Sequence, residues 1–260
     1  MNKKTIVITG ASSGLGKATS LEFARQGWSI AVADINQQRG EETVAEIEAL
    51  GSDAFFQFCD VTKGEDIQAL HDRCLTVWPK IDVLVNNAGI VSALGAIDRV
   101  PMQEWQRAIE VNLFGVVRGC MIFAPTFKQQ QSGHIVNIAS IAGLVTIPGM
   151  TSYSASKAAV VSLSEMLRSE LKSKKVGVTV VCPSLFQTNL AESLQHAKEG
   201  QQDLIDEAME KSSLTAEDIA ALIFSAVRKN QFMLLPHKSS WLQWWLKRLS
   251  PSLYQWVIAR

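Results

Sequence analysis

Residues 5–16 read TIVITGASSGLG, and they indicate the architecture of the whole chain. The first five positions are all apolar or β-branched, which is typical of a strand buried on both faces of a parallel sheet. Gly10, Gly14 and Gly16 follow, and apolar residues then recur at helical spacing over 16–26. Strand, glycine-rich turn and helix in this order predict a nucleotide site, because glycines let the backbone approach a pyrophosphate and a helix N-terminus presents free N–H groups.

The alternation of strand-like and helix-like segments continues as far as residue 182. Strands are expected at 5–9, 29–33, 54–58, 81–85, 134–138 and 178–182, and helices at 16–26, 38–50, 64–77, 102–130 and 152–174. Such alternation implies right-handed βαβ crossovers. The predicted fold class is α/β: a single-domain, Rossmann-type, doubly wound parallel sheet with helices on both faces.

One catalytic domain is expected over residues 1–236, followed by a tail over 237–260. The segment at about 184–211 breaks the alternation, because it is polar and weakly periodic. It follows a strand's carboxyl end, where such folds bind ligands, so a lid-like insertion is expected there, with a plain surface excursion as the alternative.

The composition excludes several classes of protein. Of 260 residues, 47% are hydrophobic and 19% are charged, and 25 basic residues balance 25 acidic ones. The zero net charge gives no support for a nucleic-acid partner. The four cysteines are widely spaced, so neither a disulfide framework nor a metal site is expected. The first residues lack a long apolar leader, and no uncharged apolar run approaches the ~18 residues that span a bilayer. A cytoplasmic protein is predicted.

Asp34 closes the second expected strand, where the adenosine ribose of a bound dinucleotide would lie. A carboxylate there can accept hydrogen bonds from both ribose hydroxyls, and it repels a 2′-phosphate. Ser13 and Ile35, which lie near the same place, are not basic. NAD(H) is therefore the favoured cofactor, and NADP(H) is the alternative because Arg39 lies close in sequence.

Tyr153 and Lys157 lie four residues apart near the start of an expected helix, so they share one face of it. A phenol normally loses its proton near pH ~10. A neighbouring ammonium favours the phenolate and brings such an acid–base group closer to neutral pH.

Several further motifs occur in a fixed order along residues 5–190. They are the TGASSGLG turn at 9–16, Asp60-Val61, Asn86-Asn87-Ala88-Gly89, Asn112, Ser140, Tyr153 with Lys157, and the segment from Pro183 to Thr188. This ordered set closely resembles the short-chain dehydrogenase/reductase family, in its shorter single-domain branch. One departure is Ser184, where the family usually has glycine after the proline, and it puts the contact to the nicotinamide carboxamide in doubt.

The resemblance implies catalytic roles for Asn112, Ser140, Tyr153 and Lys157. Tyr153 would exchange a proton with the substrate oxygen as hydride moves to or from the nicotinamide. Lys157 would hold the nicotinamide ribose and lower the pKa of Tyr153. Ser140 would position the substrate oxygen, and Asn112 would anchor a water that relays protons.

The resemblance also implies a set of cofactor-binding residues. They are Gly10, Ser12, Ser13, Gly14, Leu15, Gly16, Asp34, Asp60, Val61, Asn87, Ala88, Gly89, Tyr153, Lys157, Pro183, Leu185 and Thr188. For Asn86, a structural role within the sheet is at least as well supported as a cofactor contact.

The predicted function is an NAD(P)-dependent oxidoreductase that interconverts a secondary alcohol and a ketone, or a primary alcohol and an aldehyde. The candidate pocket residues are apolar, which favours an apolar substrate: Val91, Leu94, Ala142, Leu144, Ile147, Met150, Leu185 and Phe186. The alternatives are a non-catalytic dinucleotide-binding redox sensor or scaffold, and an epimerase or dehydratase on the same fold. The resemblance also implies a homodimer or homotetramer.

The tail holds four of the seven tryptophans, Trp241, Trp244, Trp245 and Trp256, together with four cations and no acid. A helix is expected over about 240–249, with Trp and Leu on one broad face and Gln243 and Lys247 opposite. Such a tail can pack on its own domain, wall the substrate pocket or contact another subunit. It can also make a peripheral contact with a membrane interface.

Overall fold

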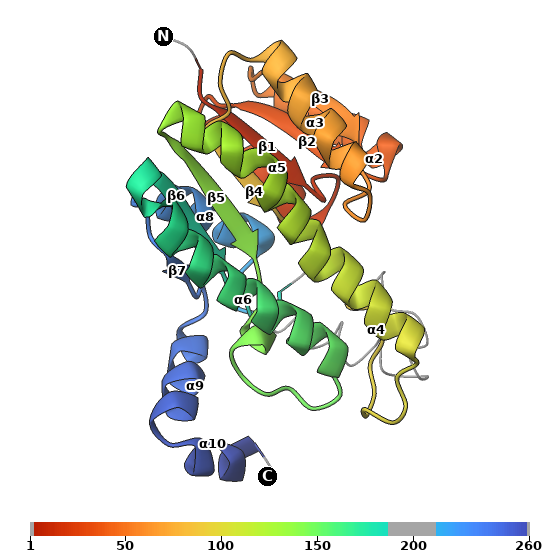
Figure 1. The fold of residues 1–260 in the computed structure, drawn as a ribbon, viewed down its shortest axis with the longest axis vertical. Helices are drawn as coiled ribbons and strands as arrows, with labels where there is room; N and C mark the ends of the chain where they lie inside the picture. The colour runs from red at the N-terminus through yellow and green to blue at the C-terminus, as the bar shows by residue number, and fades with distance from the viewer. Residues whose placement is uncertain (1–2, 187–211, 259–260) are drawn as a thin grey trace.

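One parallel sheet organises residues 3–186 and 212–258, the part of the chain that the computed structural model describes. Within this part seven strands follow the order β3-β2-β1-β4-β5-β6-β7 (Figure 1). The strands are β1 Thr5–Thr9, β2 Ser29–Asp34, β3 Ala54–Phe58, β4 Val83–Asn86, β5 Gly133–Ile138, β6 Val176–Val181 and β7 Met233–Leu234. The chain winds outward from β1 to β3 and then returns to β4 on the other side of β1, so the carboxyl ends of β1 and β4 flank the switch point where such sheets bind ligands.

Helices cover both faces of this sheet (Figure 1). On one face lie α1 Gly14–Arg25, α2 Gln37–Ala49 and α8 Ala216–Arg228. On the other lie α3 Gly64–Val77, α5 Gly115–Gln130 and α6 Thr151–Leu171. The alternation of side chains along each strand divides the core accordingly. Ile6 and Ile8 pack toward α1 and α8, whereas Val7 packs toward α3 and α5.

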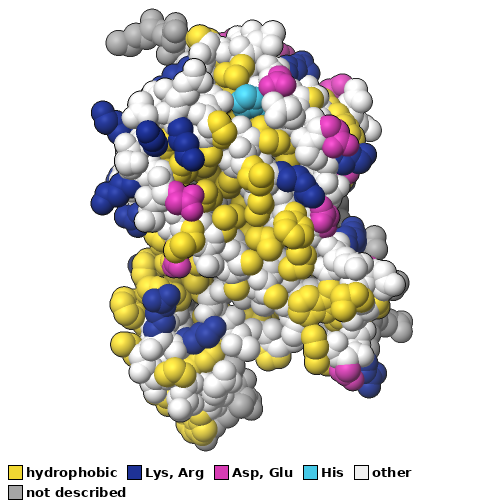
Figure 2. Space-filling model, viewed as in Figure 1, with side chains coloured by type: hydrophobic (Ala, Val, Ile, Leu, Met, Phe, Trp, Pro, Cys, Tyr) yellow, Lys and Arg dark blue, Asp and Glu magenta, His cyan; other side chains and the backbone are white. Residues whose placement is uncertain are grey.

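A continuous helical segment spans residues 102–130. It comprises α4 Met102–Ile109, a π-helical turn over Glu110–Phe114, and α5. By length and mean hydropathy alone it could cross a membrane, and 44% of its most apolar window is buried. Phe123 and Phe127 are fully buried against the sheet, as in the core helix of a globular domain. Figure 2 shows apolar side chains gathered along α5 and α6, where Met121 and Met166 are exposed.

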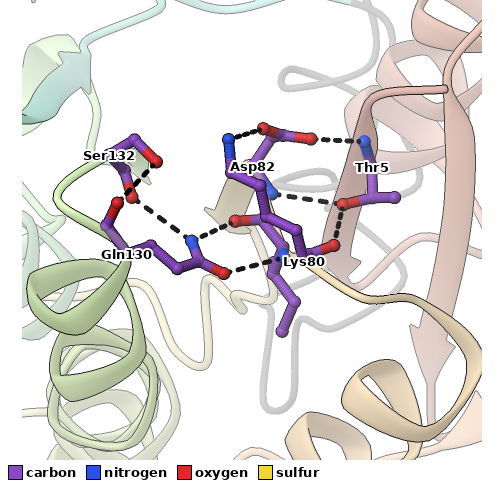
Figure 3. Close-up of polar contacts among 6 residues, drawn as sticks. Thr5, Lys80, Asp82, Gln130 and Ser132 are labelled. Carbon is purple, nitrogen blue, oxygen red and sulfur yellow. Dashed lines mark hydrogen bonds and ion pairs between the residues drawn. The ribbon is translucent and has the colours of Figure 1, made fainter. Parts of the chain in front are cut away.

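A network of hydrogen bonds fixes the amino ends of β1 and β4 (Figure 3). The Thr5 N–H donates to Asp82 Oδ2 at 3.0 Å, and the Asp82 N–H donates to Thr5 Oγ1 at 3.1 Å. Thr5 Oγ1 also donates to the carbonyl of Lys80 at 2.8 Å. The Gln130 side chain, at the end of α5, pairs with both backbone groups of Ile81. This network sets the register of the two strands whose opposite ends bear the candidate site.

Two helices follow the sheet: α9 Lys238–Leu249 and α10 Pro251–Ile258. They lie at the end of the molecule toward which the strands point their carboxyl ends (Figure 1). The strand β7 just before them pairs with β6 through Val180 and Val181. The tail therefore starts from an edge strand of the main sheet and reaches the ligand-binding end.

The four cysteines lie in the interior. Cys59, Cys74, Cys120 and Cys182 are all free and buried. Burial raises the pKa of each thiol to about 12. The sequence-based expectation of no disulfide framework agrees with this arrangement.

The predicted fold class is confirmed, and all six expected strands form. Helices α8 and α10 and strand β7 were not predicted from the sequence. A signal for α8 was present, because Thr215 and Asp218 form a capping box at its start. Most of the insertion expected at about 184–211 lies outside the described residues.

Candidate active site

A cleft of about 1750 Å³ opens at the carboxyl ends of the strands. One end is lined by the turn after β1 and by the residues that follow β2, β3 and β4. The other end is lined by the residues that follow β5 and β6, by the start of α6 and by part of the tail. The two ends differ in chemistry. The first exposes polar side chains and backbone N–H and carbonyl groups, and the second is largely apolar.

The turn between β1 and α1 is shaped by its glycines. Gly10 has φ +65° and Gly14 has φ +50°, a region that residues with a side chain adopt reluctantly. A Cβ at Gly10 would lie 2.8 Å from the Cα of Ala88. The Asn87 side chain closes the turn by donating to the carbonyls of Thr9 and Gly10, each at 2.9 Å.

This turn suits a phosphate. Helix α1 begins after Ser13, whose side chain caps no N–H group, and Ser13, Gly14 and Leu15 line the cleft. Uncapped N–H groups and the positive end of the helix dipole are the features that bind an anion. Gly16 does not line the cleft, because it packs against the Gly10 carbonyl and the Asn87 side chain.

Asp34 is held rigidly at the end of β2. Its Oδ2 accepts a hydrogen bond from the Ser12 N–H at 3.0 Å, and its Oδ1 accepts one from the Asn36 N–H at 2.9 Å. Each carboxylate oxygen has a second lone pair, so Asp34 can still accept hydrogen bonds from the hydroxyls of a ribose. Arg39 lines the same part of the cleft, and Asp60 and Val61 line it after β3.

Tyr153, Lys157 and Ser140 meet where the two ends of the cleft join. All three side chains are buried but line the cleft. The Lys157 ammonium lies 5.7 Å from the centre of the Tyr153 ring, and it donates to the Ile138 carbonyl at 2.8 Å. Ser140 lies after β5 and Tyr153 lies in the first turn of α6, so two different elements place them together.

Burial sets the proton affinities of this group. It raises the pKa of Tyr153 to about 12, and a hydrogen bond with the Ser140 side chain opposes the shift. Burial also lowers the pKa of Lys157 to about 8. The lowering effect expected of Lys157 on the pKa of Tyr153 stays a prediction, while the largest influence on that pKa is the loss of water, which raises it.

Asn112 lies behind the cleft, in the π-helical turn. Its Oδ1 accepts from the Ile90 N–H and its Nδ2 donates to the Ile90 carbonyl, both at 2.8 Å, and Nδ2 also lies 3.2 Å from Ser156 Oγ. A Cβ at Gly89 would lie 3.2 Å from Asn112 Oδ1 and 3.3 Å from Lys157 Nζ. Because Gly89 has no side chain, the space between Asn112 Oδ1 and Lys157 Nζ stays open. Asn112 itself lies in a π-helical turn, and such turns are frequent at functional sites.

The apolar end of the cleft contains most of the pocket residues expected from the sequence. Val91, Ala142 and Tyr153 form a small cluster, joined by Leu94, Ile147 and Met150. Leu185 and Phe186 line the cleft as well. Leu144 does not, because it packs in the main core.

The tail contributes a wall that the sequence analysis did not assign to particular residues. Gln243, Leu246, Tyr254 and Val257 line the cleft. Lys247 donates to the Leu144 carbonyl at 2.8 Å. A signal was available for Tyr254, which is one of only two tyrosines in the chain and supplies a polar hydroxyl within an apolar segment.

Two expectations concern the segment after β6. Ser184 is not among the described residues with positive φ, so serine is accommodated there without strain. Its N–H lies 3.3 Å from His237 Nδ1, just before the tail. Pro183 and Leu185 line the cleft, and Thr188 lies outside the described residues. Asn86 does not line the cleft and instead donates to Asn137 Oδ1 at 2.9 Å, which links β4 to β5.

The fold is a Rossmann-type sheet, and the cleft lies at the switch point where such sheets bind dinucleotides. The chain belongs to the short chain dehydrogenase family, whose model matches residues 4–199. A probable oxidoreductase of Mycobacterium tuberculosis, EphD, is 35% identical over 235 residues. That match takes in 87% of this chain and 40% of the relative, so this chain spans less than half the length of that protein.

Two solved structures resemble the chain as well. A short chain dehydrogenase/reductase from Burkholderia phymatum in complex with NAD has a TM-score of 0.91 and 32% identity, over 97% of this chain and 95% of that one. An alcohol dehydrogenase from Thermococcus sibiricus complexed with 5-hydroxy-NADP has a TM-score of 0.78 and 26% identity, over 90% of this chain and 96% of that one.

Proposed function

We propose that the protein is an NAD(P)-dependent alcohol dehydrogenase or carbonyl reductase for an apolar substrate, with Tyr153 as its acid–base group. The observation that carries the proposal is the position of Tyr153, which lies at the junction between a phosphate-binding glycine turn and an apolar pocket within one cleft. A dinucleotide bound in the cleft would supply or accept the hydride at this junction. The substrate oxygen then has to lie against Tyr153.

Tyr153 suits the role of proton donor. With a pKa of about 12 it is a neutral phenol at physiological pH, ready to protonate the oxygen of a ketone as that oxygen gains charge. Ser140 is placed to donate a second hydrogen bond to the same oxygen and so to orient it.

Lys157 suits the role of proton reservoir. Its pKa of about 8 lies close to the working pH, so it can release and regain a proton there. We propose that a hydroxyl or a water that bridges Lys157 and the Tyr153 hydroxyl carries the proton between them. Asn112 fixes the backbone at Ile90, and we assign it the task of holding such a water beside Gly89.

We assign the cofactor contacts to the predicted residues that line the cleft. They are Gly10, Ser12, Ser13, Gly14, Leu15, Asp34, Asp60, Val61, Asn87, Ala88, Gly89, Tyr153, Lys157, Pro183 and Leu185. Gly16 is left out of this set, because it packs against the Gly10 carbonyl on the side of the turn away from the cleft. The fixed carboxylate of Asp34 favours NAD(H), because a 2′-phosphate would face its negative charge.

The test is binding followed by turnover. Calorimetry of the purified protein with NADH and with NADPH measures the cofactor preference, and a panel of apolar alcohols and ketones measures activity. Tight binding of NADH with turnover of any panel member would support the proposal. If a cofactor binds but no member of a broad panel is turned over, the alternative of a non-catalytic redox sensor is favoured. If neither cofactor binds, the dehydrogenase and the redox sensor are both excluded.

We also propose a cytoplasmic homodimer or homotetramer. The apolar side chains along α5 and α6, including the exposed Met121 and Met166, give it a surface for subunit contact (Figure 2). Sedimentation of the protein and of the Met121→Glu/Met166→Glu variant measures this directly, since charges on a subunit interface lower the mass of the assembly.

A further inference from the structure

Helix α9 is amphipathic in the reverse of the usual sense, because its solvent side is apolar. Leu242 is 72% exposed and Leu249 is 78% exposed, and Trp241 and Trp245 are exposed beside them. At 100° per residue these four side chains lie within one third of the helix circumference. The side that faces the protein carries three polar residues. Ser240 is buried, Lys247 donates to the Leu144 carbonyl, and Gln243 lines the cleft.

Helix α10 extends this apolar surface. Leu253 and Trp256 are exposed, whereas Tyr254 between them is buried, and α10 packs against α9. We call the six exposed side chains the tail face: Trp241, Leu242, Trp245, Leu249, Leu253 and Trp256. Four of these large apolar side chains lie on a single helix, α9.

The tail face also carries positive charge. Lys238 and Arg248 are exposed at its borders, and the Arg248 guanidinium lies 4.6 Å from the centre of the Trp244 ring. From Ile219 to Arg260 the sequence has six cations and no acid, so residues 1–218 carry a net charge of −6 within a chain of zero net charge. In the lower-left part of Figure 2, over α9, apolar and basic side chains lie side by side.

We infer that the tail face docks on a membrane surface that contains anionic lipid. Tryptophan favours the interfacial layer of a bilayer, and lysine and arginine bind anionic headgroups. The 12 residues of α9 span about 18 Å at 1.5 Å per residue, which is too short for the ~30 Å hydrocarbon core, so the helix lies on the surface. A two-fold contact between two tail faces would place cations opposite cations, with no acid in this part of the sequence to pair with them.

The tail face adjoins the cleft. Val257, on the same helix as Trp256, is partly exposed and lines the cleft, as do Leu246 and Gln243 of α9. Docking would therefore place the apolar end of the cleft at the lipid surface. This extension rests on the proposed function, and it makes the substrate a lipophilic alcohol or ketone that partitions into membranes.

The experiment is vesicle flotation of the full chain, which requires no turnover. Phosphatidylcholine vesicles are compared with vesicles of phosphatidylcholine and phosphatidylglycerol, at low and at high salt. We expect at least tenfold more protein bound to the anionic vesicles, a loss of most of this binding at high salt, and a blue shift of tryptophan fluorescence.

Three double variants locate the contact. Trp245→Glu/Leu249→Glu should lower binding to the anionic vesicles at least tenfold. Lys238→Glu/Arg248→Glu leaves the apolar groups intact and should lower the same binding at least tenfold. Leu50→Glu/Val77→Glu replaces two exposed apolar residues far from the tail and should bind like the parent. Circular dichroism and cofactor binding establish that each variant is folded.

Three results would overturn the inference. They are equal binding to neutral vesicles, equal loss in the Leu50→Glu/Val77→Glu variant, and absence of vesicle binding by the parent. If the parent fails to bind and Trp245→Glu/Leu249→Glu lowers the mass of the oligomer, the tail face is instead a contact between copies of the chain. Each of these results leaves the proposed oxidoreductase activity untouched, since that activity is measured separately in solution.

Discussion

The hydroxyl of Tyr254 bonds to both backbone groups of Thr146. It accepts a hydrogen bond from the Thr146 N–H at 2.8 Å and donates one to the Thr146 carbonyl at 3.3 Å. Tyr254 belongs to α10, and Thr146 belongs to the segment between β5 and α6 that follows Ser140. One side chain thus joins the tail to the segment that carries a proposed catalytic residue, across 108 positions of sequence.

We expect Tyr254→Phe to destabilise the protein and to loosen the apolar end of the cleft. The Thr146 N–H would lose its partner in a partly buried place, at a cost of about 1–3 kcal/mol. Urea unfolding measures this loss. KM for a large apolar substrate should rise severalfold, with cofactor affinity unchanged, whereas an unaltered KM and an unaltered midpoint would show that the tail is not held by this contact.

Tyr153→Phe should lower kcat by at least about a thousandfold, because it removes the proton donor and little binding surface. NADH affinity, measured by calorimetry, should stay within about threefold of the parent, since most of the proposed cofactor contacts remain. The control is Tyr254→Phe, which removes the other tyrosine hydroxyl and should retain most of kcat. Activity of Tyr153→Phe within severalfold of the parent would contradict the assigned mechanism.

Lys157→Met should abolish most activity and yet raise the stability of the fold. The pKa of Lys157 falls from 10.5 to about 8 on folding, so the charged form is disfavoured in the native state. Below pH 8 Lys157 is charged in both the folded and the unfolded state, and the full penalty opposes folding. Between pH 8 and 10.5 only the unfolded chain holds the proton, so the penalty shrinks as the pH rises. Above pH 10.5 both states are neutral and the penalty disappears. At pH 7, removing this penalty should raise the free energy of unfolding by up to about 3 kcal/mol. The lost hydrogen bond to the Ile138 carbonyl offsets about 1 kcal/mol of that gain.

Urea unfolding of the parent and of Lys157→Met at pH 7 and at pH 10 measures this effect. The stability difference should favour the variant at pH 7 and should narrow at pH 10. A difference independent of pH would mean that Lys157 is not held with a lowered pKa.

Asp34→Ala should weaken NADH binding about tenfold and relax discrimination against NADPH, because the carboxylate that faces the 2′ position is lost. Both affinities can be measured by calorimetry. The neighbouring Arg39→Ala provides the comparison, since its loss should weaken NADPH rather than NADH. An unchanged preference in Asp34→Ala would show that the ribose lies elsewhere in the cleft.

Asp82→Ala should destabilise the fold without affecting kcat. Its carboxylate accepts from the Thr5 N–H at the end of the sheet remote from the cleft (Figure 3), and loss of that bond costs about 1–3 kcal/mol. Lys80→Ala is the matched control, because it removes only an exposed ion pair to the same carboxylate and should cost less than about 1 kcal/mol. Thermal unfolding and kcat together decide whether this network acts on stability alone.

The fold was predictable because its signals are local. Strand β1 is β-branched at every position and ends at a glycine turn, and this pattern requires no knowledge of distant residues. Gly10 and Asp34 lie directly after β1 and at the end of β2, so their positions along the chain placed them at the edge of the sheet where they line the cleft. The role of Tyr153 was predicted from the family resemblance. The capping box of α8 was equally local, and it was overlooked.

The remainder depends on tertiary structure. No local pattern places Tyr254 against Thr146, and the sequence of α9 does not reveal which of its faces meets solvent. The raised pKa of Tyr153 could not be predicted for the same reason, since spacing along a helix identifies a neighbouring ammonium but not the loss of water on burial. Leu144 was placed in the pocket because it is apolar and near Ser140, whereas it packs in the core.

The buried cysteines have a practical consequence. Alkylating reagents react with the thiolate, and buried thiols with a pKa of about 12 form very little of it at neutral pH. The parent protein should therefore resist maleimide labelling while folded. A Leu249→Cys variant would then carry one reactive thiol, so a single environment-sensitive dye could be attached at a chosen point without first removing the native cysteines.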